Sequence, residues 1–424
     1  MTGTILQAIE QALDRARADE WNCLSDVLRD RALDQAAQLD RRIAAGFAVP
    51  PLAGLPYVVK SLFDVKGACT LAGGPADASL PVAADDAQLV RELTDAGAIL
   101  IGIGQMDEYA YGFFGNSPHH GRVLNPIYRE RVSGGSSSGS AAAVAAGIVP
   151  FAVGSDTNGS VRVPAAFCGI FSLKPSYGRL PLAGSMPLAQ SLDHAGILAD
   201  SLDTLASVWF ALDPAGLPSV DRDTLRLGWA AGDYRDLSSA PVRAALVQIQ
   251  SQWPGSAEVE LLHVEESLAT ASRLTAFEAA ANHRARLRDQ PGLYSDAVAR
   301  RLAAGARIRT ADYELAKHAQ NRIGRAVRQT FSADGIDVLI APVAPVNGLG
   351  LDEPHVTLGG NEVTAADAAG LFTRPFSLTG LPVLTIPAAR DDRGGPLTAL
   401  QLIGRPGEER TLFACARELL RPVD

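Results

Sequence analysis

The sequence predicts an α/β protein, because short apolar runs that are typical of buried strands alternate with segments of helical composition. With 424 residues, 47% of them hydrophobic, the chain can bury a large core, and its length alone allows two or three domains. The strand-like runs lie at residues 57–60, 99–104, 149–153, 225–229 and 338–342. The helical segments lie at residues 86–96, 141–146, 241–252 and 311–331.

The first 48 residues are expected to form two helices. Ile5, Ile9 and Leu13 recur at helical spacing, and residues 32–45 are rich in Ala, Leu, Gln and Arg. Two prolines at positions 50 and 51 then end the helical pattern.

Residues 57–60 (YVVK) predict a short buried strand that ends in Lys60. A lysine considered alone is more often a surface residue whose stem packs on apolar neighbours. The proline four positions before Lys60 and the β-branched residues leading to it instead favour a lysine held inside the fold.

A second apolar strand, residues 99–104 (ILIGIG), runs into glycines. A dinucleotide-binding fingerprint would need a third glycine where Asp107 stands, so a dinucleotide site is disfavoured. The aromatic residues that follow predict either one wall of a pocket or a plain core cluster; they are Tyr109, Tyr111, Phe113 and Phe114.

The most unusual stretch runs from residue 131 to 162 and contains the clusters GGSSSGS (134–140) and DTNGS (156–160). Glycine and serine at this density let backbone N–H groups approach an anion or oxyanion closely. A flexible linker is disfavoured, because strong helix formers at 141–146 and an apolar run at 149–153 separate the clusters.

Two familiar motifs fit this stretch poorly. A phosphate loop would need a lysine where Ser140 stands, after the GxxxxG of Gly134 and Gly139. A hydrolase nucleophile elbow, GxSxG centred on Ser137, should follow a buried strand, and residues 127–131 are too polar for one. It would also need a partnered histidine, and no histidine of the sequence has a convincing setting.

The segments GGSSSGSAAAVAAG and GSDTNGSVRVPAAFCGIFSLKPSYGR resemble the signature of the amidase-signature hydrolases, and the resemblance extends from about residue 52 to about residue 420. It implies a Ser–Ser–Lys catalytic set with Ser160 as nucleophile, Ser136 as relay, and Lys60 of GLPYVVK as base. It also implies an oxyanion hole of backbone N–H groups, those of Thr157, Asn158, Gly159 and Ser160. Lys60 could take a proton only when neutral, a state that burial favours.

The same resemblance implies one domain over residues 1–424, built on a large twisted mixed β-sheet with helices on both faces, in which residues 213–312 vary between members. Residues 192–200 resemble a closing loop and the next helix start, so His194 is expected to be structural. Residues 374–382 and 396–404 resemble the last strands of the sheet.

Closer similarity connects the runs PPLAGLPYVVKSLFDV, MDEYAYGF and DVLIAPVAPV to amidases of s-triazine and biuret breakdown. That resemblance implies hydrolysis of a non-peptide C–N bond in a small, polar, carboxylated, 1-carboxybiuret-like substrate. The sequence departs from the family pattern GKTNMxE at residues 102–108 (GIGQMDE), which puts the substrate preference in doubt. A general aliphatic or aryl amidase, the amidase component of a tRNA-dependent amidotransferase, and a noncatalytic binding protein on the same scaffold stay open.

Arginines concentrate at residues 294–309, and a guanidinium can hold a carboxylate with two parallel hydrogen bonds. Arg301 and Tyr294 are therefore the expected substrate-binding residues, with Tyr109 beside the pocket. A solvated basic helix face is the alternative explanation.

The composition of the chain limits which partners and which cellular compartment can be expected. The net charge of −9 and pI near 5.4 disfavour a nucleic acid partner. Four scattered cysteines predict a reducing cytoplasm, and neither a signal peptide nor a membrane span is expected. No histidine pattern suggests a metal site, so we expect neither metal nor cofactor. A homodimer is expected, and the open alternative is a complex with a small accessory subunit.

Overall fold

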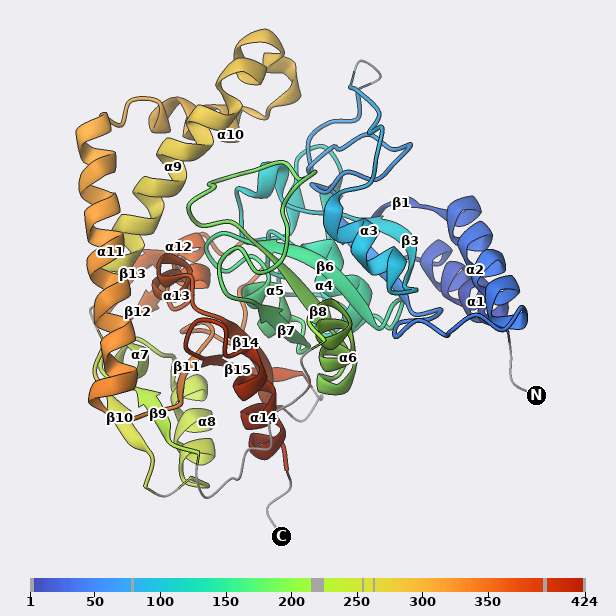
Figure 1. Ribbon diagram of the computed structural model, residues 1–424. Coiled ribbons are helices and arrows are strands. Elements are labelled where there is room, and N and C mark those ends of the chain that lie inside the picture. Colours follow the sequence, from blue (N-terminus) through green and yellow to red (C-terminus); the bar gives the residue numbers. More distant parts are fainter. Residues whose placement is uncertain are drawn as a thin grey trace.

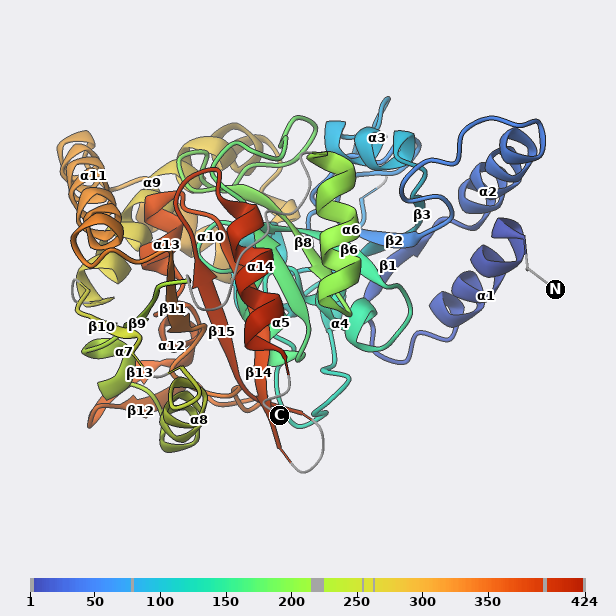
Figure 2. The ribbon, with the colours of Figure 1, turned by 60° about the horizontal axis from the view of Figure 1, so that its bottom comes forward.

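The computed structural model describes residues 4–77, 80–214, 225–253, 255–261, 264–391 and 395–421. Its main sheet has eleven strands among these residues, with both parallel and antiparallel neighbours, and helices cover both faces (Figures 1 and 2). This confirms the predicted α/β class. The spatial order is β1 (Leu24–Val27), β3 (Ile99–Gly104), β2 (Pro56–Lys60), β6 (Phe151–Asp156), β8 (His194–Ala199), β7 (Phe171–Lys174), β14 (Val383–Arg390), β15 (Pro396–Ile403), β11 (Val338–Pro342), β9 (Leu227–Ala230) and β10 (Ala257–Val259).

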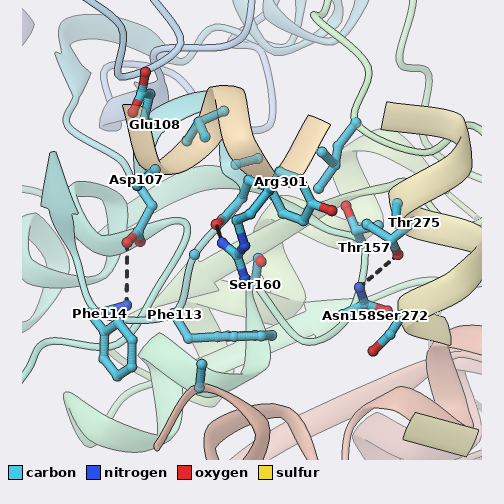
Figure 3. A pocket seen from close by; sticks show the side chains of 18 of the residues that line it. Asp107, Glu108, Phe113, Phe114, Thr157, Asn158, Ser160, Ser272, Thr275 and Arg301 are labelled. Atoms are coloured by element: carbon cyan, nitrogen blue, oxygen red, sulfur yellow. Dashed lines mark hydrogen bonds between the residues drawn. The ribbon is translucent and has the colours of Figure 1, made fainter. Parts of the chain in front are cut away.

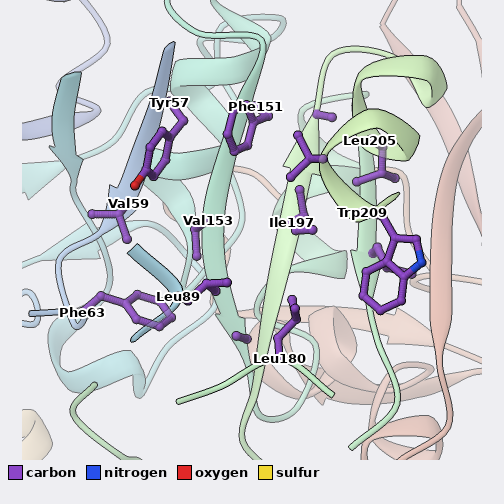
Figure 4. Packing of buried hydrophobic residues seen from close by; sticks show 14 of the residues in the cluster. Tyr57, Val59, Phe63, Leu89, Phe151, Val153, Leu180, Ile197, Leu205 and Trp209 are labelled. Atoms are coloured by element: carbon purple, nitrogen blue, oxygen red, sulfur yellow. The ribbon is translucent and has the colours of Figure 1, made fainter. Parts of the chain in front are cut away.

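Successive residues of a strand point to opposite faces of a sheet, and β2 shows this directly. Tyr57 and Val59 join the larger core cluster, where the Tyr57 ring stacks on Phe151 with 5.1 Å between centroids (Figure 4). Val58 joins the cluster on the other face. Because both faces are covered, β2 is apolar from Pro56 to Val59 rather than alternating, and burial of an apolar side chain of this size stabilises the fold by about 1.5–3 kcal/mol.

The two core clusters place helices on the two faces of this half of the sheet. Residues of α3 (Gln88–Asp95), α6 (Leu202–Leu212) and α14 (Glu409–Leu419) belong to the first cluster. Residues of α1 (Ile5–Arg17), α2 (Arg29–Ala44) and α4 (Ser138–Ala145) belong to the second. Helix α1 begins with a capping box, in which Thr4 Oγ1 accepts from Gln7 N (3.3 Å) and Gln7 Oε1 accepts from Thr4 N (3.2 Å).

The second half of the chain adds a helical layer of α9 (Val264–Asp289), α10 (Asp296–Gly305) and α11 (Thr310–Ala333), which Figure 1 shows in yellow and orange. Of the segment expected to vary, residues 215–224, 254 and 262–263 lie outside the described residues, as do residues 1–3 of the N-terminal segment. The remaining described helices are α5 (Arg162–Phe167), α7 (Asp233–Asp236), α8 (Ala240–Gln250), α12 (Ala365–Gly370), α13 (Arg374–Thr379), η1 (Glu108–Ala110) and η3 (Pro291–Leu293). Two small hairpins pair β4 (Asn116–Ser117) with β5 (Gly121–Arg122), and β12 (His355–Leu358) with β13 (Asn361–Thr364).

Two sequence predictions of elements were wrong. Residues 374–382 do not form a strand: Pro375 lies in the first turn of α13, and Gly380, with φ of 66°, ends this helix before β14 begins. Within residues 192–200, the expected loop is largely the buried strand β8, which pairs with β6 and β7, and α6 begins only at Leu202. Local resemblance did not separate a short apolar strand from a loop here.

Candidate active site

The site lies where three adjacent parallel strands end. Strand β2 pairs in parallel with both β3 and β6, so the carboxyl ends of the three strands meet at one edge of the sheet. Lys60 is the last residue of β2, Asp156 is the last of β6, and Asp107 follows β3 by three positions. The predicted lysine and the DTNGS cluster are thus neighbours because of sheet topology, although about 95 positions separate them in sequence.

Lys60 is completely buried, as the sequence pattern predicted. Its Nζ lies 2.7 Å from Ser136 Oγ and 2.8 Å from Ser155 Oγ, with Ser155 O at 3.5 Å. Burial disfavours the ammonium form and lowers the pKa of Lys60 to about 7, against an opposing effect from nearby carboxylates such as Asp107 and Asp156. The lysine can therefore hold or release a proton near neutral pH.

The glycine-rich loop packs tightly against the segment that follows β3. Asp107 N donates to Ser136 O at 3.3 Å, and the Asp107 carboxylate accepts from three backbone N–H groups, at residues 114–116. A Cβ atom on Gly135 would collide with the Asp107 carboxylate, so only glycine fits there. This close approach is what places Ser136 against Lys60.

Ser137 does not have the geometry of a nucleophile elbow. Its Oγ donates to Ser155 O (3.1 Å) and accepts from Ser155 N (3.2 Å), so both hydroxyl functions are used within the core. Its side chain is fully buried, and residues 123–137, all of them described, contain none of the strands of the fold.

Ser160 lies at the end of a turn that Asp156 organises. The Asp156 carboxylate accepts from Gly159 N (2.8 Å), Val161 N (3.2 Å) and Arg162 Nε (2.9 Å), and Arg162 Nη2 adds a second ion-pair contact at 2.9 Å. Asp156 and Arg162 are both fully buried, and this pairing holds the pKa of Asp156 well below its ordinary value despite burial. Arg162 also donates to carbonyl and side-chain oxygens of the C-terminal half, those of Thr373, Ser377 and Gln401.

A cavity of about 590 Å³ opens over this turn (Figure 3). Ser160 reaches its wall with 3% of its surface exposed, whereas Lys60 and Ser136 lie behind the wall with none. Three of the four aromatic residues expected beside the pocket contribute to the lining, which also includes two arginines. These residues are Tyr111, Phe113, Phe114, Arg301 and Arg374.

The residues predicted to bind substrate lie at different depths. Arg301 lines the cavity from α10, donates through Nη1 to Tyr111 O, and places its guanidinium 4.4 Å from the centre of the Tyr111 ring. Tyr109 and Tyr294 are absent from the lining formed by the described residues and pack on each other with 4.7 Å between ring centroids. Tyr109 Oη donates to Leu293 O at 2.6 Å, so this tyrosine pair connects the loop after β3 to the start of α10.

Sequence reasoning missed Ser155 and Asp193. Ser155 contacts the buried lysine directly, and its position two residues beyond the predicted strand 149–153, inside the observed β6, was the available signal. Asp193 Oδ1 accepts from Thr157 Oγ1 at 2.6 Å, and burial raises the pKa of Asp193 to about 6. The neighbouring His194 is buried, and burial lowers its pKa to about 3, so its ring is neutral at working pH.

Within the described residues, no group of His, Cys, Asp and Glu side chains is arranged to hold a metal ion. The described helices include none with the length and hydropathy of a membrane span. The four cysteines are not paired in disulfides.

Comparisons with known proteins agree with this geometry. The family model described as Amidase matches residues 7–213 and 237–413. The chain is 38% identical to AtzE, a 1-carboxybiuret hydrolase subunit of Pseudomonas sp. strain ADP, over 92% of this chain and 88% of that protein. It is 34% identical to a glutamyl-tRNA(Gln) amidotransferase subunit of Ralstonia nicotianae, over 96% and 92% of the two chains.

Solved structures give the same result. A structure reported as an unexpected vestigial protein complex that reveals the evolutionary origins of an s-triazine catabolic enzyme superposes with a TM-score of 0.91 at 36% identity, covering 98% of this chain and 95% of that one. A structure reported as an amidase superposes with a TM-score of 0.89 at 34% identity, covering 97% and 95%. The buried lysine and serines, the matching family model and these relatives together show that the chain belongs to the amidase family and is a hydrolase acting on C–N amide bonds.

Proposed function

We propose that this protein hydrolyses an amide or urea C–N bond of a small, polar, carboxylated substrate through an acyl-enzyme on Ser160. The observation that carries the proposal is the 2.7 Å contact between Lys60 Nζ and Ser136 Oγ, directly behind the cavity wall that holds Ser160. A serine hydroxyl needs a base to take its proton as it attacks, and a buried lysine with a lowered pKa can be that base.

In the proposed acylation step, Ser160 Oγ attacks the carbonyl carbon while its proton passes to Ser136 Oγ and the Ser136 proton passes to neutral Lys60. Collapse of the tetrahedral intermediate breaks the C–N bond, and the proton returns through Ser136 to the leaving nitrogen. Water then attacks the acyl-enzyme and the same relay restores Ser160. Ser155 Oγ and O give the two N–H groups of a neutral lysine their acceptors, so the nitrogen lone pair is directed at Ser136.

Backbone N–H groups of the DTNGS turn are proposed to hold the oxyanion, where one such donor is typically worth about 3–4 kcal/mol. The N–H of Gly159 already donates to Asp156 at 2.8 Å. We therefore assign this role to the N–H groups of Thr157, Asn158 and Ser160. The side chain of Asn158 donates to Thr275 Oγ1 at 2.9 Å, which ties the turn to α9.

Arg301 is proposed to hold the carboxylate of the substrate, since it is a cation on the wall of the cavity that contains Ser160. Tyr109 and Tyr294 support it from behind by joining the loop after β3 to the start of α10. The similarity to a 1-carboxybiuret hydrolase subunit supports a carboxylated urea as the substrate class.

A second candidate function is the amidase component of a tRNA-dependent amidotransferase, which the 34% identity to an amidotransferase subunit favours. A general aliphatic or aryl amidase is the third. Ammonia release measured over a panel of carboxylated ureas, malonamate-like acids, glutamine and aryl amides separates them. Our proposal expects the carboxylated ureas or small amide acids to have the highest kcat/KM. Preference for glutamine or for aryl amides would contradict it.

We further propose that the enzyme acts on a free small molecule in the cytoplasm as a homodimer, or with a small accessory subunit. The compartment is proposed from the four unpaired cysteines, and the assembly from the similarity to a protein that is itself one subunit of a 1-carboxybiuret hydrolase. Light scattering of the purified chain measures its assembly state directly, and a monomer that is fully active would contradict both assemblies.

A further inference from the structure

The cavity contains a second arginine that the proposed mechanism does not use. Arg374 begins α13 and lines the same cavity as Ser160 and Arg301. Only 5% of its surface is exposed, which is unusual for an arginine, since this residue type is mostly exposed in proteins.

The hydrogen bonds of Arg374 are incomplete. Its Nη1 donates to Asp367 O (3.1 Å) and its Nη2 to Asp367 Oδ1 (3.3 Å). Its Nε is buried and has no partner among the described residues. Each Nη carries two hydrogens and has one acceptor among the described residues, so an N–H on each remains for a ligand in the cavity that Arg374 lines.

The charges around Arg374 also favour an anion. Burial lowers the pKa of Arg374 to about 10, and the positive charge of Arg301 acts in the same direction. Two like charges close enough to repel each other gain from an anion between them. Asp367, whose side chain is 37% exposed, raises the pKa of Arg374 more than Arg301 lowers it, but burial outweighs Asp367 and the pKa stays below its ordinary value.

The Asp107 and Glu108 carboxylates, which also line the cavity, already accept hydrogen bonds from within the protein. Asp107 accepts from backbone N–H groups at residues 114–116. Glu108 accepts from Ser295 N at 2.8 Å and from Ser295 Oγ, and it faces His119 Nε2 at 3.3 Å. Among the described residues that line the cavity, the two arginines are therefore the cations available to a ligand.

The lack of a side chain at Gly370 leaves room for the Arg374 guanidinium beside the Phe113 ring. Gly370 lies one turn before Arg374, and a Cβ atom there would come within 2.8 Å of Phe113 and 3.2 Å of the Arg374 guanidinium carbon. The Arg374 guanidinium in turn lies 5.6 Å from the centre of the Phe113 ring. A side chain at position 370 would push both groups out of place.

We propose that Arg374 is a specificity-determining residue which, together with Arg301, forms a two-arginine subsite for the carboxylate on the acyl side of the substrate. This inference rests on the proposed function and adds a residue from α13, a segment distant in sequence from α10. The Nη N–H groups of Arg374 that Asp367 leaves free donate to the carboxylate, and Asp367 positions the guanidinium.

The test compares kcat/KM for an acid and its neutral amide, malonamate against malonamide and succinamate against succinamide. Arg374→Met is expected to lower the acid-to-amide ratio about tenfold or more, because a charge-assisted hydrogen bond is lost only for the acid. Arg374→Lys keeps the positive charge but lacks the planar set of N–H donors, so we expect an acid-to-amide ratio between those of the wild type and Arg374→Met. This variant provides the test if Arg374→Met does not fold.

Asp367→Asn is the matched control. It removes the negative charge beside Arg374 but keeps the cation and, in the amide Oδ1, an acceptor for Nη2, so the acid-to-amide ratio should rise while the thermal stability falls in both variants. Equal losses for acid and amide in the Arg374 variants, with the ratio unchanged, would show a purely structural arginine and overturn the inference. A wild-type enzyme that prefers the neutral amides would instead contradict the proposed function itself. Loss of the preference in Arg301→Met but not in Arg374→Met would contradict this inference alone.

Discussion

The floor and the roof of the cavity are built in different ways. The floor consists of Lys60, Ser136, Ser155 and the Asp156 turn, which are buried and hydrogen-bonded to one another at the ends of adjacent strands. The roof consists of the loop after β3, α10 and the start of α13, whose polar groups meet across long sequence distances and in part face water.

This difference separates chemistry from selectivity. A proton relay requires short, fixed distances between its groups, and the close packing of the floor supplies them. For the same reason, the floor should tolerate few substitutions. Side chains of the roof line the cavity but, among the described residues, make no hydrogen bond to Lys60 or Ser136, so substitutions there should change which substrate is bound more than they change the bond-breaking step. The predictions below compare the two regions.

The largest effect is expected at the centre of the floor. Lys60→Ala removes the base and should lower kcat roughly 10⁴-fold or more, with the circular dichroism spectrum unchanged. Lys174 is the matched control: it is also fully buried with its pKa lowered to about 7, but its Nζ donates only to Pro175 O and Leu381 O among the described residues. Lys174→Met should keep kcat within a few-fold per folded molecule. A Lys60→Ala enzyme with more than a tenth of the wild-type kcat would refute the relay.

The second effect concerns the stability of the floor. Asp156→Asn leaves Arg162 buried without its partner and should lower the free energy of unfolding by about 3–5 kcal/mol. The surface pair of Arg309 and Asp312 provides the control, and Asp312→Asn should leave the unfolding midpoint in urea unchanged within error. Similar midpoints for the two variants would mean that the buried pair does not organise the Ser160 turn.

The third effect is on pH dependence. Because the pKa of Lys60 is lowered to about 7, the neutral base is scarce at low pH, so kcat/KM should rise about tenfold per pH unit below 7 and level off above it. Asp193, with a pKa raised to about 6, titrates in the same range, and its charge raises the pKa of Lys60. If Lys60 is the titrating group, Asp193→Asn should keep the rise of kcat/KM with pH and move its midpoint slightly downward.

The variant Ser155→Ala gives a second test of Lys60 as the group that sets the pH dependence. It removes an acceptor for the ammonium form of Lys60, so the apparent pKa should shift downward and kcat should fall about tenfold. A profile that stays flat from pH 5 to 9, or one that rises only near pH 10, would contradict a neutral lysine base.

The smallest effect is expected in the roof. Glu108→Gln weakens the contact with Ser295, which caps α10 by accepting from Val298 N at 3.3 Å. The helix that carries Arg301 should become less well positioned, so KM for an acid substrate should rise a few-fold while kcat stays close to the wild-type value. A loss confined to kcat would mean that the roof takes part in the chemistry.

The same division explains what could be predicted from sequence. Lys60, Ser136 and Ser160 each stand in a short local pattern, and the strand that carries Lys60 is apolar enough to be recognised alone. Neighbouring parallel strands bring Lys60 and the Ser160 turn together, and the packing of the glycine-rich loop on Asp107 adds Ser136. The contacts of Arg374 with Asp367 and of Glu108 with Ser295 have no such pattern, because tertiary packing creates them. At residues 374–382 the resemblance to a strand was also misleading, because apolar residues such as Phe376 and Leu378 lie in a short helix with proline in its first turn.

The most direct test of the central claim is to identify the residue that becomes acylated. The purified enzyme is treated with a fluorophosphonate probe near pH 8 and digested, and the labelled peptide is mapped by mass spectrometry, with Lys60→Ala and Ser137→Ala treated in parallel. We expect the label on Ser160 in the wild type and in Ser137→Ala, and very slow labelling in Lys60→Ala. Label on Ser137, or equally fast labelling without Lys60, would contradict the Ser160–Ser136–Lys60 account.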